Sequence, residues 1–132
     1  MVPVLENAIA EWSHVQGSFA EIIRKGQNPL PEHYSAVKAE VVTDDSHTQV
    51  NEDLVQDLLA YDYVYVAGEA LSHCLANTVR DMIRYDIDPK KIIILEDCTS
   101  NVTGFEELGA SFNLEMELIG VRFMITLEVE FE

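Results

Sequence analysis

Two short, uncharged apolar runs separated by a helical pattern constrain the fold of this 132-residue chain more than any other feature. Residues 63–67 (Tyr-Val-Tyr-Val-Ala) and 92–95 (Ile-Ile-Ile-Leu) are rich in β-branched and aromatic side chains, which is typical of strands covered on both faces. Between them, apolar residues recur at helical spacing from about Ser72 to Tyr85. Strands that alternate with helices form parallel sheets. We therefore predict an α/β fold, a three-layer α/β/α sandwich with a mainly parallel, Rossmann-like sheet.

The N-terminal half of the chain contains weaker signals of the same kind. Pro3 suits the first turn of a helix whose apolar residues continue to Trp12, and Gly17 is expected to end that helix. Residues 18–24 (Ser-Phe-Ala-Glu-Ile-Ile-Arg) are predicted to form a strand, which a loop rich in Gly, Asn and Pro follows. Asn51 is the predicted cap of a second helix, because its side chain can accept a hydrogen bond from a free backbone N–H.

The C-terminal segments complete the predicted sheet. Residues 105–119 have an apolar stripe at helical spacing, and residues 121–125 are predicted to form a further strand. Residues 127–131 alternate apolar side chains with glutamates, which indicates an exposed or edge strand. No repeat or linker separates these segments, so residues 1–132 are expected to form a single domain.

Charge and composition narrow the classes of partner. The chain has 24 acidic and 8 basic side chains and a formal net charge of −16. Nucleic-acid phosphates and anionic lipid repel such a chain, so we expect it to bind neither nucleic acid nor membranes. No apolar run approaches the roughly 20 residues that span a bilayer. The N-terminus lacks the pattern of a signal peptide, and two cysteines make no disulfide framework, so we predict a cytoplasmic location.

Cys74 is the first candidate for chemistry, because it lies at the start of a predicted helix directly after a buried strand. Free backbone N–H groups and the helix dipole stabilise a thiolate at such a position and can also hold an oxyanion. The alternative interpretation is a small buried apolar residue, which is what most free cysteines are. Lys25, which directly follows the predicted strand over residues 18–24, would favour the thiolate if the fold placed it nearby. The alternative interpretation of Lys25 is an ordinary exposed lysine without a role in chemistry.

Other combinations of reactive residues are weaker candidates. His73 adjoins Cys74, but consecutive helical residues point in different directions, and His33 could approach only through the fold. Residues 45–47 (Asp-Ser-His) have the spacing of some metal sites but are interpreted as a solvated turn. Cys98 makes no CxxC motif with Cys74 and is taken as structural. We therefore predict neither a metal site nor a cofactor.

Two longer motifs follow one another along the chain. Residues 24–29 (Arg-Lys-Gly-Gln-Asn-Pro) precede a Tyr-Ser-Ala segment at 34–36, and residues 68–78 read Gly-x-Ala-x-x-x-Cys-x-x-x-Thr. In this order they resemble the isochorismatase-like cysteine hydrolases, and within them the nicotinamidase-type amidohydrolases. The run Ile-Leu-Glu-Asp at 94–97 fits the next strand of that family, which commonly ends in Asp. The resemblance covers nearly the whole chain.

The resemblance implies a role for each matching residue. Cys74 would be the nucleophile, and Lys25 would be the basic member of an Asp-Lys-Cys triad. The backbone N–H groups of Ala70 and Cys74 would form the oxyanion hole, and the peptide bond between Glu69 and Ala70 would be cis. The implied reaction is hydrolysis of a small, nicotinamide-like C–N amide through a thioester on the cysteine.

The sequence also departs from that family. No residue before Lys25 supplies the triad Asp or the Asp-x-His metal ligands, and His14 lies in the predicted first helix. The resemblance implies that the N-terminal third of the domain is missing, including the strand beside the one that leads to Cys74. We therefore expect a hydrolase that is impaired in this chain. The alternative is a non-catalytic α/β module that acts as a homo-oligomer or is completed by an N-terminal segment.

Overall fold

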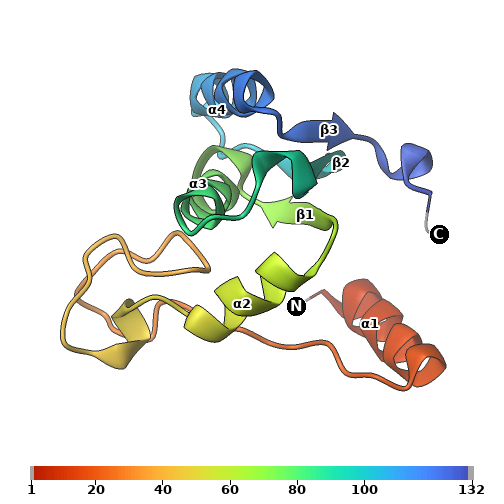
Figure 1. The fold of residues 1–132 in the computed structure, drawn as a ribbon, viewed down its shortest axis with the longest axis horizontal. Coiled ribbons are helices and arrows are strands. Elements are labelled where there is room, and N and C mark those ends of the chain that lie inside the picture. Colours follow the sequence, from red (N-terminus) through yellow and green to blue (C-terminus); the bar gives the residue numbers. More distant parts are fainter. Residues whose placement is uncertain (1, 131–132) are drawn as a thin grey trace.

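A parallel sheet lies at the centre of the computed structural model, which describes residues 2–130. Within these residues the sheet has three strands, β1 (Val64–Glu69), β2 (Ile92–Ser100) and β3 (Arg122–Met124), in the order β1-β2-β3. Both strand pairs are parallel. The α/β fold class with a parallel sheet is therefore confirmed (Figure 1).

Helices pack on one face of this sheet and bury a single apolar core. They are α2 (Glu52–Ala60), α3 (Ala76–Arg84), which a π-helical turn precedes, and α4 (Glu106–Ile119). Side chains from all three helices share a core with alternate residues of β2. The core residues include Val55, Val79, Met82, Ile92, Ile94, Phe112 and Met116.

The opposite face of the sheet is not covered by these helices, which corrects the expectation that residues 63–67 are covered on both faces. Tyr63 is 56% exposed and Tyr65 is 38% exposed. A groove of about 630 Å³ runs over this face, lined by both tyrosines together with Ile93, Arg122 and Met124. The guanidinium of Arg122 lies 5.0 Å from the centre of the Tyr63 ring, a cation–π contact.

The N-terminal helix α1 (Pro3–Gln16) forms where the sequence predicts it and ends at Gly17, whose φ of 64° is left-handed. It has no buried residue, and it lies apart from the helices that cover the sheet (Figure 1). The predicted strand over residues 18–24 is wrong, because this segment has no regular secondary structure. A strand needs a neighbour for its ladder of hydrogen bonds, and β1 pairs only with β2 within residues 2–130.

The predicted C-terminal edge strand is also wrong over the described residues. Thr126–Glu128 is a short 3₁₀ helix, and Phe131 lies outside the described residues. Two more 3₁₀ turns lie in loops, at Ser46–Thr48 and Pro89–Lys91. Asn51 caps α2 as predicted, accepting a hydrogen bond from the Leu54 N–H at 3.1 Å.

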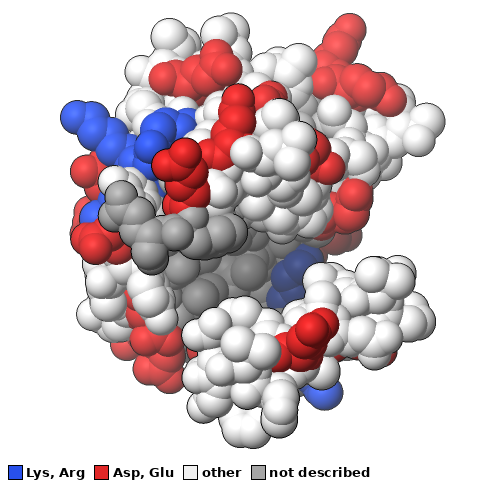
Figure 2. Space-filling model, turned by 90° about the vertical axis from the view of Figure 1, so that its right-hand side faces the viewer, with Lys and Arg blue, Asp and Glu red and all other residues white. Residues whose placement is uncertain are grey.

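Acidic side chains are spread over the surface that Figure 2 shows, in keeping with the net charge of −16. No helix among residues 2–130 is long and apolar enough to cross a membrane.

Candidate active site

Cys74 lies in a single π-helical turn directly after β1, not in the regular helix that the sequence predicts there. The peptide bond between Glu69 and Ala70, the one for which the resemblance implies a cis geometry, is cis. The π turn spans Leu71–Leu75, and two of its amides, one on each side of Cys74, donate to the Ala70 carbonyl oxygen at 3.0 and 3.1 Å. π-helical turns are rare and frequently lie at functional sites. The turn places the thiol at the N-terminal end of α3.

Lys25 reaches this thiol from a position 49 residues earlier in the chain. Its Nζ lies 3.4 Å from Cys74 Sγ and also donates a hydrogen bond to the carbonyl oxygen of His33 at 2.9 Å. The lysine is exposed and the cysteine is half-buried. The contact places a cationic amine next to the sulfur in a chain whose formal net charge is −16. The structure thus brings together two residues that the sequence selected separately.

His33 closes the loop that follows Lys25. Its Nδ1 accepts a hydrogen bond from the backbone N–H of Gly26 at 3.0 Å. Partial burial lowers the pKa of His33, the positive charge of Lys25 lowers it further, and the negative charge of Glu40 opposes both. The imidazole is therefore neutral at pH 7, with its proton on Nε2, since an Nδ1 that accepts cannot also carry a proton.

Two hydroxyl groups fix the turn that contains Cys74. Thr78 Oγ1 donates to the Cys74 carbonyl oxygen at 2.7 Å and accepts from the Ala36 N–H at 3.0 Å, which ties the turn to the loop region. Ser72 Oγ accepts from the Val102 N–H at 3.1 Å, which ties it to the chain after β2. The sequence pattern contained Thr78 only as the last position of a motif. In helices, a Thr hydroxyl often donates to the carbonyl oxygen four residues earlier. The spacing of Cys74 and Thr78 was therefore a sequence signal for this bond.

Aromatic rings gather around His73, the residue before Cys74. The His73 ring lies 5.0 Å from the Phe105 ring in an edge-to-face arrangement and 6.0 Å from the Tyr34 ring. The negative charge of Glu32 is the main cause that raises the pKa of Tyr34, and Cys74 adds to the rise. The Tyr34 phenol therefore stays protonated at neutral pH. His73 packs among rings and is not paired with the thiol.

The other candidates lie outside this group. His47 Nδ1 is 2.9 Å from Asp45 Oδ1, and Asn28 donates to Asp45 Oδ2 at 2.8 Å. These bonds, those from His47 first, lower the pKa of Asp45. Over residues 2–130, no group of three or more His, Cys, Asp or Glu side chains could hold a metal ion. Cys98 is exposed, and neither cysteine forms a disulfide.

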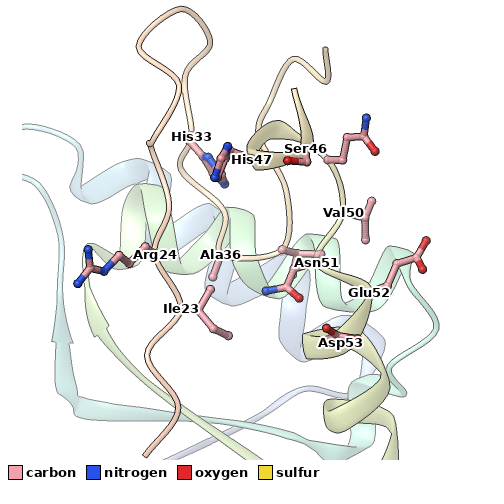
Figure 3. A pocket seen from close by; sticks show the side chains of 12 residues that line it. Ile23, Arg24, His33, Ala36, Ser46, His47, Val50, Asn51, Glu52 and Asp53 are labelled. Carbon is pink, nitrogen blue, oxygen red and sulfur yellow. The ribbon is translucent and has the colours of Figure 1, made fainter. Parts of the chain in front are cut away.

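A cavity of about 560 Å³ lies behind the Lys25 loop, next to the start of α2 (Figure 3). His33 and His47 lie together along one side of it, whereas Arg24 points away from both (Figure 3). Cys74 is not one of the residues that line it. The cavity shares His33 with the group around the thiol.

No carboxylate completes the pair of Lys25 and Cys74 in the described part of the chain. The hydrogen bonds of the Lys25 amine go to His33 and Cys74, and the described ion pairs involve other residues. Within residues 2–130, the pair of Lys25 and Cys74 therefore has an amine and a thiol in contact but no acidic group beside them.

Solved structures to which this chain is similar include nicotinamidases. The nicotinamidase/pyrazinamidase of Acinetobacter baumannii matches with 25% identity and a TM-score of 0.63, over 83% of this chain and 49% of that chain. The chain has the isochorismatase-like fold. The yeast nicotinamidase matches with 19% identity and a TM-score of 0.63, over 89% of this chain and 50% of its own. No protein-family model matches the chain, and no curated protein does. The chain spans about half the length of those solved structures.

Proposed function

We propose that this chain carries the nucleophile and the lysine of a cysteine hydrolase that cleaves a small, nicotinamide-like C–N amide. The observation that supports this most is the 3.4 Å contact between Lys25 Nζ and Cys74 Sγ, which the fold makes across 49 residues. The similarity to nicotinamidases supports the amide chemistry. The rings of Tyr34, His73 and Phe105, which cluster around the residue before Cys74, suit a planar aromatic substrate.

The proposed reaction uses few groups. The Cys74 thiolate attacks the amide carbonyl carbon, and the backbone N–H groups of Ala70 and Cys74 hold the oxyanion that forms. The C–N bond breaks, the nitrogen takes up a proton and leaves as ammonia, and a thioester remains. Water then attacks the thioester, which releases the carboxylic acid and returns the thiol. Lys25 stabilises the thiolate at the start and the end of this cycle.

We further propose that the chain by itself turns over slowly. The departing nitrogen needs a proton and the attacking water must lose one, and these transfers typically contribute about 10²-fold to 10⁴-fold to rates. Within residues 2–130, neither Lys25 nor Cys74 contacts a carboxylate that could carry out these transfers. Attack by the thiol is then expected to be easier than completion of the cycle.

One experiment tests separately whether Cys74 is the nucleophile and whether turnover is slow. In a Cys98→Ser background, the chain is incubated with nicotinaldehyde, the inhibitor bound in one of the yeast nicotinamidase structures. Addition of the Cys74 thiolate to the aldehyde carbon gives a thiohemiacetal, which absorbance and the loss of titratable thiol report. Cys74→Ser should abolish the signal and Lys25→Ala should weaken it. A parent chain that forms no adduct contradicts the proposed nucleophile. Sustained ammonia release from nicotinamide contradicts the proposed impairment.

The second candidate is a non-catalytic module that acts by association, and the exposed face of the sheet favours it. Tyr63 is exposed there, β1 has a free edge among the described residues, and α1 buries no residue. Light scattering after size exclusion tests this candidate, with a homo-oligomer as the expected result. Tyr63→Glu should weaken the association, whereas Leu118→Glu, on an exposed part of α4, should not. A monomer contradicts self-association and leaves completion by an N-terminal segment.

A further inference from the structure

We infer that His33 is a positioning residue that holds Lys25 against Cys74. This inference rests on the proposed function of that pair. His33 accepts two hydrogen bonds from consecutive residues: the Lys25 amine donates to its carbonyl oxygen at 2.9 Å, and the Gly26 N–H donates to its Nδ1 at 3.0 Å. Backbone and side chain of one residue thus fix both ends of the lysine, its main chain and its amine.

The lysine needs such a support, because little else restrains it. Lys25 is exposed and sits on a segment without regular secondary structure. Its flexible stem loses rotamer freedom when the amine is fixed, and no carboxylate binds the amine within residues 2–130. The His33 carbonyl and the thiol are the two acceptors that hold the amine in the described structure.

The support is anchored to the nucleophile's own backbone through Thr78 of α3, the helix that directly follows the turn of Cys74. Three residues after His33, the Ala36 N–H donates to Thr78 Oγ1, and Thr78 in turn donates to the carbonyl oxygen of Cys74. The Cys74 backbone is thus linked through Thr78 to the segment that contains His33. His33 binds the Lys25 amine, and that amine contacts the Cys74 thiol. A displacement of His33 therefore changes the distance between the amine and the sulfur.

The contact with Gly26 depends on the charge of His33. A neutral imidazole accepts at Nδ1, whereas an imidazolium has N–H groups on both nitrogens and cannot accept. Lys25 and Glu40 are the charged groups that act most on this ring. The cavity that His33 lines also contains charged or titratable groups, which are Arg24, His47, Glu52 and Asp53 (Figure 3). Acidification should therefore release the Gly26 N–H and loosen the lysine.

The test measures how fast iodoacetamide alkylates Cys74 in a Cys98→Ser background. Lys25→Ala gives the rate without the amine. His33→Ala keeps the carbonyl that accepts from the amine but removes the acceptor of the Gly26 N–H, so the loop that carries Lys25 loosens. Alkylation at pH 7 should therefore slow, by about threefold to tenfold, as it does in Lys25→Ala. His33→Asn keeps an acceptor oxygen near the place of Nδ1 and should stay within about twofold of the parent. His14→Ala, on the exposed helix α1, should not change the rate.

The pH profile separates positioning from a general loss of structure. The ratio of the parent rate to the His33→Asn rate should be constant above pH 7. It should fall at pH values below 6.5, the ordinary pKa of histidine, because only the parent has a ring that becomes charged. A flat ratio, or a His33→Ala rate equal to the parent rate while Lys25→Ala is slow, overturns this inference alone. A Lys25→Ala rate equal to the parent rate overturns this inference and the proposed role of the lysine together.

Discussion

The two halves of the described chain are held together by different kinds of interaction. Of the fifteen buried apolar residues, thirteen lie between residues 55 and 121, and only Val37 and Ala39 come from the earlier part. The early part is held instead by side-chain hydrogen bonds, such as those that Asp45 and Thr78 make. Cys74 belongs to the packed half and Lys25 to the hydrogen-bonded half. The proposed site therefore depends on how well a polar segment stays attached to an apolar body.

The largest difference in the free energy of unfolding is expected between substitutions of two aromatic residues, one in each half. Phe112 is fully buried in the core, whereas Trp12 is about half exposed on α1. Phe112→Ala should lower the free energy of unfolding by about 3–5 kcal/mol, because it removes apolar contacts and leaves a cavity. Trp12→Ala should change it by about 0.5 kcal/mol or less. Urea unfolding followed by far-UV circular dichroism measures both. Equal losses would show that α1 is packed in solution.

The next largest effect on stability is expected from substitution of a glycine within α4. A Cβ added at Gly109 in α4 would clash with Asn101 Oδ1, an oxygen that is buried. Alanine favours a helix over glycine by about 1 kcal/mol, but the clash must push the amide away. Gly109→Ala should therefore destabilise the chain by about 1–3 kcal/mol. Gly109→Ala combined with Asn101→Ala should recover most of the loss, and a stabilising single variant would contradict the packing.

The packed half is also the part that sequence patterns predict well. Runs of β-branched residues and helical spacing located the centres of β1, β2, α3 and α4, because burial between neighbours in the chain leaves a periodic pattern. Glycine after α1 and Asn51 before α2 marked helix ends by their own local chemistry. The exposed sheet face was not predicted, since a strand's composition does not show whether a layer lies over it.

The hydrogen-bonded half was predicted less well, for reasons specific to it. Residues 18–24 have the composition of a strand, but pairing depends on a neighbouring strand. Lys25 could be selected from the sequence, but its contact with Cys74 in the packed half could not be derived from spacing. The contact of His33 with Gly26 and Lys25 depends on the closure of a loop, which spacing alone does not show.

A glycine at the end of α1 tests the polar half on a smaller scale. Gly17 has a left-handed φ of 64°, and no atom would contact an added Cβ within 4 Å. Gly17→Ala should therefore cost about 1 kcal/mol of helix stability from backbone strain alone. Because α1 buries no residue, the cost should appear as fraying of α1 in amide exchange, with the midpoint of core unfolding unchanged. A lower core midpoint would show that α1 and the sheet unfold together.

The smallest effect on stability is expected from protonation of Asp45, which lies in the loop region before α2. Hydrogen bonds from His47 and Asn28 lower the pKa of this carboxyl below its ordinary value of 3.8. A carboxyl with a lowered folded pKa contributes stability above the ordinary value and loses it as the pH falls through the lowered one. The His47 amide, which donates to Asp45 Oδ1 at 3.0 Å, should therefore shift in NMR spectra below pH 3.8, while amides of β2 stay unchanged. Asp45→Asn should remove the pH dependence at His47. If the β2 amides shift together with the His47 amide, the two halves unfold as one unit, and the attachment of the Lys25 loop cannot vary independently of the core.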